Sequence, residues 1–139
     1  MSIVQTQTTS FKKELYQGIH DLLTDEIRIA LYTAFADLNA DTTVYSTTNE
    51  ITGTGYTAGG EILQNATVQS SGTTAYVSFS NVTWNPASFT ARCALIYNVT
   101  QGNKSVAVLD FGSDKTAVNT FTITMPANTP TAALIRSSY

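Results

Sequence analysis

Charged side chains are scarce in this chain of 139 residues. Asp, Glu, Lys and Arg make up only 12% of the sequence, about half of the roughly 25% that is usual in soluble domains. The net charge is −3, so the surface lacks the positive charge that neutralises phosphates, and we expect no nucleic-acid partner. Hydrophobic residues account for 42% of the chain, which is enough for one globular domain with its own core.

Histidine and cysteine occur once each, as His20 and Cys93. Together they supply too few ligands for a zinc site, and neither lies at a spacing that pairs a nucleophile with a base. A single Cys forms no internal disulfide, which is consistent with synthesis in a reducing cytoplasm. The ten acidic residues form no paired-carboxylate motif. We therefore expect a protein that is not an enzyme and that uses no cofactor and no metal.

Long hydrophobic runs are also missing, so the sequence predicts no segment that spans a membrane. The first residues lack the signal-peptide pattern of a basic stretch followed by an apolar one. Four Asn-x-Ser/Thr sequences occur, at Asn65, Asn81, Asn98 and Asn103. A chain rich in Asn, Ser and Thr produces such sequences by chance, and without a signal peptide we expect them to carry no glycan.

Glycine is concentrated in residues 51–61, ITGTGYTAGGE, where residues 53–58 fit the G-x-G-x-x-G/A pattern of dinucleotide-binding turns. That pattern binds pyrophosphate only where a helix begins directly after the turn. The residues after Gly60 instead alternate and contain Val, Thr and Tyr, as strands do. We interpret the glycines as positions of positive φ in a long connection that Tyr56 covers.

A second loop resembles a calcium-binding pattern only in part. Asp37, Asn39 and Asp41 occupy positions 1, 3 and 5 of that pattern, but Thr42 replaces the Gly of position 6 and Thr48 the Glu of position 12. Asp and Asn are also common in ordinary turns. We therefore interpret this segment as a turn.

Helical periodicity is found in one segment, residues 10–24, where apolar residues recur at three- and four-residue spacing. Thr9 and Ser10 can cap its start, and Gly18 is a mild weakness inside it. Residues 1–9 form a polar arm without structure of its own, so we expect the body to fold without residues 1–10. The apolar stripe comprises Phe11, Leu15, Ile19, Leu22 and Leu23.

After residue 25 the apolar period changes to two, which predicts strands joined by Gly, Ser and Asn turns. The run around Leu95 is apolar on both faces, so we expect its strand to be covered on both sides. The sequence predicts a mainly β, antiparallel sandwich or barrel-like body over residues 26–127 with one N-terminal helix, in a single domain of residues 10–139 that ends in a tail, residues 128–139. Strands are expected within residues 26–33, 42–48, 66–79, 89–111 and 119–127.

Three blocks, NEITGTGYTAGG (49–60), ARCALIYN (91–98) and AVLDFGSDK (107–115), together with the order of elements over residues 26–127, resemble small virion proteins of tailed bacteriophages. The likeness is greatest to head decoration (cement) proteins. It implies a β-rich body bound to the outside of an icosahedral capsid, usually as a trimer, with the major capsid protein or other virion proteins as partners. It also implies synthesis in the host cytoplasm and localisation in the virion.

Two alternatives remain: a tail, neck or baseplate component, and a carbohydrate-binding β-sandwich module. The second requires exposed aromatic side chains at Trp84 or Tyr56, where Trp84 is either a core residue or a binding anchor. The arm and the tail can lie across a neighbouring chain or add a strand to its sheet. The candidate interaction residues are therefore Ile3, Val4, Tyr56, Trp84, Leu134, Ile135 and Tyr139.

Overall fold

A five-stranded antiparallel sheet forms the centre of the protein in the computed structural model, which describes residues 3–138, without the side chain of Ser138. The structure is mainly β, with 44% of residues in strands and 6% in helix, as the sequence predicts. The central sheet has the order β1 (Thr6–Gln7), β8 (Lys104–Ala117), β7 (Phe89–Asn98), β2 (Ile27–Tyr32) and β3 (Glu61–Ile62).

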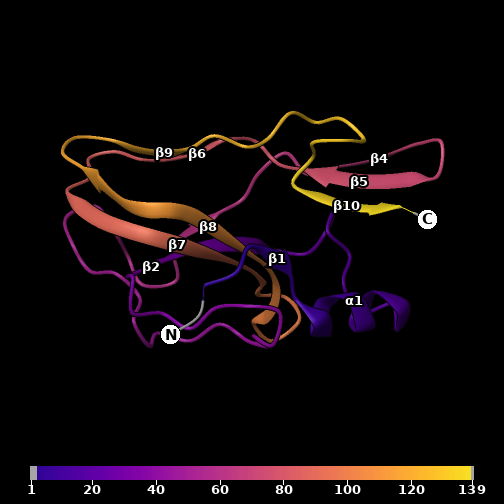
Figure 1. The fold of residues 1–139 in the computed structure, drawn as a ribbon, viewed down its shortest axis with the longest axis horizontal. Helices are drawn as coiled ribbons and strands as arrows, with labels where there is room; N and C mark the ends of the chain where they lie inside the picture. Colours follow the sequence, from indigo (N-terminus) through magenta and orange to yellow (C-terminus); the bar gives the residue numbers. More distant parts are fainter. Residues whose placement is uncertain (1–2, 139) are drawn as a thin grey trace.

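Two smaller antiparallel sheets complete the fold. One is the pair β6 (Val82–Trp84) and β9 (Phe121–Ile123), and Figure 1 shows this pair as a layer facing β7 and β8. The other has the order β10 (Ile135–Ser138), β5 (Thr74–Ser78) and β4 (Thr67–Ser71). It lies beyond one end of the central sheet, next to the helix α1 (Thr9–Tyr16), and all five residues of β4 are exposed.

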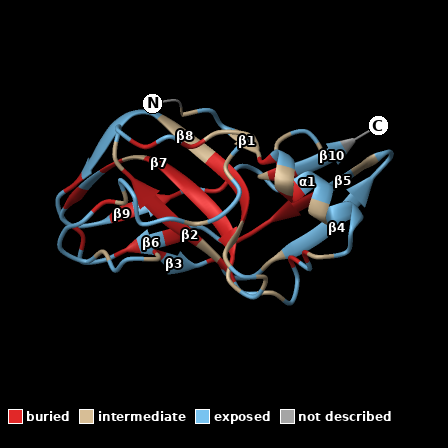
Figure 2. Ribbon diagram, turned by 90° about the horizontal axis from the view of Figure 1, so that it is seen from below, coloured by how far each residue is buried: buried red, intermediate tan, exposed pale blue. Residues whose placement is uncertain are grey.

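From Cys93 to its end, β7 is buried on both faces, as its sequence predicts (Figure 2). Ala94 and Ile96 point into the main core, which also contains side chains of β2, β6 and β9. Cys93 and Leu95 point into a second apolar cluster on the opposite face. Residues 33–50, rather than a helix or another sheet, supply the cover of that face, with Leu38 among the buried residues.

α1 is shorter than the sequence predicts, and it ends at Tyr16 instead of residue 24. Gly18 terminates it: its φ is +71°, its N–H donates to the Leu15 carbonyl at 3.1 Å, and the N–H of Ile19 donates to the Glu14 carbonyl at 3.0 Å. These two bonds form a Schellman motif, which requires a left-handed residue where glycine is best tolerated. Gly18 is therefore the end signal of the helix, not a weakness inside it.

The N-terminal cap of α1 is Thr8, not Thr9 or Ser10. The Thr8 hydroxyl accepts from the N–H of Phe11 at 3.3 Å and from the hydroxyl of Ser105, in β8, at 2.9 Å. Thr8 is fully buried because β1, which directly precedes it, pairs with β8. A long-range strand pairing thus fixes the helix start, because local propensity alone does not distinguish Thr8 from Thr9 or Ser10 as the cap.

The predicted arm and tail are both parts of the fold. Ile3 pairs with Leu38 in an isolated parallel bridge, and β1 and Thr8 follow it, so residues 3–9 are not the unstructured arm that the sequence predicts. In the tail, β10 pairs with β5, and Ala133 and Ile135 belong to the core. Each end of the chain forms a strand that pairs with an otherwise free edge, β1 with β8 and β10 with β5.

The strand predictions are right for the long alternating runs and wrong for residues 42–48. That segment makes one isolated bridge, between Val44 and Lys104, and otherwise follows the surface of the second cluster. Four short strands are not predicted: β3 and β6 within the body, and β1 and β10 in the arm and the tail. In the last strand, Phe121, Ile123 and Met125 are buried, as their alternation predicts.

Candidate binding groove

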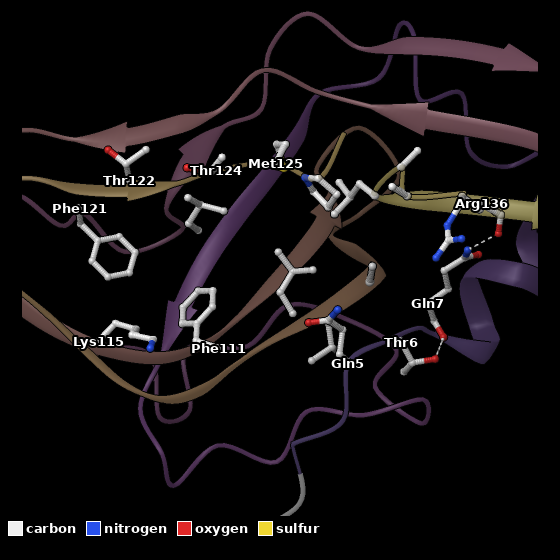
Figure 3. Close-up of a pocket in the computed structure, with 18 of the residues that line it drawn as sticks. Gln5, Thr6, Gln7, Phe111, Lys115, Phe121, Thr122, Thr124, Met125 and Arg136 are labelled. Atoms are coloured by element: carbon white, nitrogen blue, oxygen red, sulfur yellow. Dashed lines mark hydrogen bonds between the residues drawn. The ribbon is translucent and has the colours of Figure 1, made fainter. Parts of the chain in front are cut away.

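An open groove of about 810 Å³ lies between β9 on one side and β1 and β8 on the other. In Figure 3, Phe111 of β8 and Phe121 of β9 point toward one another across it, with ring centroids 6.1 Å apart. Leu134, which precedes β10, is half-buried and also lines it. The floor is therefore apolar, while Thr122 and Thr124 lie on the β9 rim.

The groove exists because the sandwich is not closed on this side. β9 pairs only with β6, so its other edge has no strand beside it. On β8, the β1 strand covers only Ala107 and Val108, and the side-chain oxygen of Gln5 accepts from the N–H of Asp110 at 3.0 Å. Beyond Asp110 the β8 chain bulges, because Arg92 alone stands opposite residues 111–114.

The charged residues in the groove lining are both cations. Lys115 lies at one end and Arg136 at the other (Figure 3). A neighbouring groove of about 400 Å³, between α1 and β10, adds Lys12 and shares Arg136. Neither lining contains an Asp or Glu. In a chain with a net charge of −3, this face is locally positive.

These cations have no carboxylate partner within residues 3–138. Lys115 and Lys12 make no hydrogen bond or ion pair there, and Arg136 donates to the Thr131 carbonyl at 2.5 Å. Asp110 lies in the chain between two groove residues, Leu109 and Phe111. Its carboxylate forms an ion pair with the Arg92 guanidinium. A hydrogen bond from the Gly112 N–H and the Arg92 guanidinium lower the pKa of Asp110, so it remains with Arg92 at neutral pH.

Of the seven predicted interaction residues, Leu134 lines the groove. Trp84 is 2% exposed and Ile135 is 4% exposed, so both are core residues, and the interpretation of Trp84 as an exposed anchor is wrong. Ile3 and Tyr56 are partly buried against the two cores, and Val4 is 48% exposed near the second cluster. Tyr139 lies outside the described residues.

The residues that define the groove were missed, and only one sequence signal pointed to them. The alternation of residues 119–127 places the threonines of β9 on the surface, but it does not show that the edge of β9 is unpaired. That fact depends on the strand order. The missed residues are Phe111, Lys115, Thr122, Thr124 and Arg136.

The glycine-rich stretch is a structural connection. The Glu50 carboxylate accepts hydrogen bonds from the hydroxyls of Tyr45 (2.6 Å) and Tyr56 and from the N–H of Gly59 (2.8 Å). β3, and not a helix, begins directly after Gly60, so this turn has no helix N-terminus to bind a phosphate. Gly60 packs so tightly against β2 that a Cβ there would lie 1.8 Å from the Ile29 carbonyl oxygen.

The two side chains most suited to catalysis, His20 and Cys93, are both buried in the structure. His20 is buried, with Nε2 2.8 Å from Glu14 Oε1 and Nδ1 accepting from Asn98 Nδ2 at 3.0 Å. Asn98 Nδ2 also donates to Asp25 at 2.8 Å. Cys93 is fully buried, and burial raises the pKa of its thiol to about 12. None of these residues lines the groove.

The calcium-like segment is an Asx turn. Asn39 accepts from the Asp41 N–H at 2.9 Å through its side-chain oxygen and donates to Asp37 at 3.1 Å through its side-chain nitrogen. Among residues 3–138, no cluster of three or more His, Cys, Asp or Glu side chains is arranged to hold a metal ion.

Among the four Asn-x-Ser/Thr sequences, Asn98 is fully buried, so a glycan on it is incompatible with this fold. The described part of the chain contains no helix of sufficient length and hydrophobicity to cross a membrane. No protein-family model, curated protein or solved structure matches the chain.

Proposed function

We propose that this protein is a structural component of a tailed-bacteriophage particle, most like a head decoration (cement) protein that binds the major capsid protein. The observation that carries the proposal is the open groove with an apolar floor beside an unpaired strand edge, in a chain whose three resemblance blocks point to virion proteins. A surface of this kind suits attachment to another protein. A trimer is the assembly that the resemblance favours.

The mechanism would be thermodynamic linkage. A protein that binds the assembled capsid, but not its dissociated subunits, stabilises the capsid by its binding free energy, about 2.7 kcal/mol per site at 100 times Kd. Many copies that each bridge two or more subunits add these contributions and gain further from effective concentration. The few charges on the chain limit the desolvation penalty of a close contact.

The carbohydrate-binding alternative loses the feature on which it depended. Trp84 is buried, and the Tyr56 hydroxyl donates to Glu50 while it accepts from the Leu31 N–H at 3.0 Å. Neither aromatic ring lies in the groove lining. A tail, neck or baseplate position is the remaining alternative, and it differs from the capsid position in copy number.

A reconstitution experiment tests the proposal. Heads made without this protein should lose their DNA at a lower temperature than complete heads, and the purified protein, added back, should restore the difference. The measurement is the temperature of DNA release, followed with a DNA-binding dye. Heat-denatured protein serves as the control. Heads that neither bind the folded protein nor change their release temperature would contradict a capsid-stabilising role.

A further inference from the structure

We propose that the groove binds an extended segment of the partner protein that carries acidic residues near both ends, and that this segment adds to β9 as a further strand. The proposal rests on the proposed function only in taking the partner to be a virion protein. Its basis is the backbone of β9, the apolar floor and the two cations at the ends of the groove.

The backbone of β9 and of the residues that flank it offers hydrogen-bonding groups to the groove. The N–H of Met125 donates to the Asn81 side chain at 2.7 Å, and the Asn119 carbonyl accepts from Ala87 at 2.8 Å, so these odd-numbered residues face the β6 side. Backbone groups of alternate residues point to opposite edges of a strand. Those of Thr122 and Thr124 therefore face the groove.

The length of this free edge limits the length of the segment that can bind beside it. Pro126 has no N–H and ends the usable edge, and the edge begins near Thr120, where the groove lining begins on this strand. Six residues in extended conformation span about 20 Å. The occupant is thus a short extended segment and not a helix.

The floor requires apolar side chains on one face of that segment. Leu109, Phe111 and Leu134 are each only partly buried while they pack against the main core. A strand beside β9 would direct every second side chain onto them. We therefore expect alternating residues of the segment to be apolar.

The charges specify the ends of the segment. Lys115 and Arg136 lie at opposite ends of the groove, and the lining has no acidic residue. An acidic residue near each end of the occupant would meet one of these cations. Charges at the rim of an interface mainly guide association and orientation, so the two cations would also select acidic partners over basic ones.

Two matched proline variants test the added strand. Thr122 and Thr83 stand opposite each other in the β6–β9 pair, and their hydroxyls share one hydrogen bond of 3.0 Å. Thr122→Pro and Thr83→Pro both remove that bond, and each deletes an N–H that faces away from the partner strand. Only the N–H of Thr122 faces the groove. We expect Thr122→Pro to weaken binding to heads at least tenfold and Thr83→Pro to change it less than twofold.

A second pair tests the charge requirement and remains informative if Thr122→Pro does not fold. Lys115→Glu and Lys13→Glu make the same change at exposed lysines that have no ion pair among residues 3–138. Lys115 lines the groove and Lys13 does not. We expect about fivefold weaker binding for Lys115→Glu and an unchanged Kd for Lys13→Glu.

The outcomes separate this inference from the proposed function. If wild-type protein binds heads and all four variants bind equally well, the groove inference is wrong and the virion role stands. If wild-type protein does not bind heads, the capsid-decoration role fails. In that case, 12-residue peptides selected from a random library on the wild-type protein test the groove alone. Selected peptides that are acidic and lose binding to Thr122→Pro, but not to Thr83→Pro, support the inference. A selection that enriches no peptide, or only peptides insensitive to Thr122→Pro, overturns it.

Discussion

Replacement of Gly60 by Ala is expected to lower the free energy of unfolding by more than about 4 kcal/mol, or to prevent folding altogether. The added Cβ would lie 1.8 Å from the carbonyl oxygen and 2.6 Å from the carbonyl carbon of Ile29. Ile29 is fully buried in β2 and pairs with β7 and β3, so its backbone has no room to move. Thermal unfolding followed by circular dichroism should show a fall in Tm of roughly 15 °C.

Gly72→Ala is the control for this prediction. Gly72 also has a positive φ, of +59°, but a Cβ there would meet no atom within 4 Å. It therefore incurs only the conformational cost, about 1–2 kcal/mol. Equal losses at Gly60 and Gly72 would show that close packing of the glycine-rich stretch against β2 does not hold the fold together.

Replacement of Glu50 by Ala should lower the free energy of unfolding by about 3 kcal/mol, because several donors lose their acceptor together. The donors are the hydroxyls of Tyr45 and Tyr56 and the N–H of Gly59. Burial and the Glu50 carboxylate raise the pKa of both tyrosines, so both hydroxyls are protonated donors at neutral pH. Urea unfolding, followed by the fluorescence of Trp84, measures the change.

Glu61→Ala provides the comparison for Glu50→Ala. Glu61 is exposed in β3 and makes no hydrogen bond through its side chain within residues 3–138. Its removal should change the free energy of unfolding by less than about 0.5 kcal/mol. A similarly small effect at Glu50 would mean that the carboxylate does not organise the glycine-rich stretch.

Alternation in the sequence was enough to predict the class of the fold, because burial of one strand face requires a period of two. It correctly assigned Phe121 and Ile123 to the core, and the doubly apolar run around Leu95 to a strand covered on both sides. In the helix, periodicity predicted the start better than the end. Apolar residues continue beyond Gly18, and only its positive φ stops the helix.

The candidate groove could not be predicted in the same way. It depends on which strands are neighbours, and the pairing of Thr6 with Val108 joins residues about a hundred positions apart. Alternation gives the two faces of β9 but not the fact that one of its edges is free. The positive character of the groove likewise arises because Lys115 and Arg136, which are distant in sequence, meet on one surface.

The residue types that could act in catalysis have structural contacts in this fold. His20 and Asn98 connect α1 to β7 through Glu14 and Asp25. Hydrogen bonds from Asn98, the Asp21 backbone and Gln101 outweigh the opposing effect of burial and lower the pKa of Asp25. None of these residues lines the candidate groove.

The number of copies of this protein in a purified phage particle tests the central claim most directly. Quantitative mass spectrometry against isotope-labelled peptides, with the major capsid protein as the internal reference, gives that number. A decoration protein predicts a constant ratio to the capsid protein, equivalent to hundreds of copies per particle. A dozen copies or fewer would assign the protein to the tail, neck or baseplate. Particles that contain none would contradict a structural role in the virion.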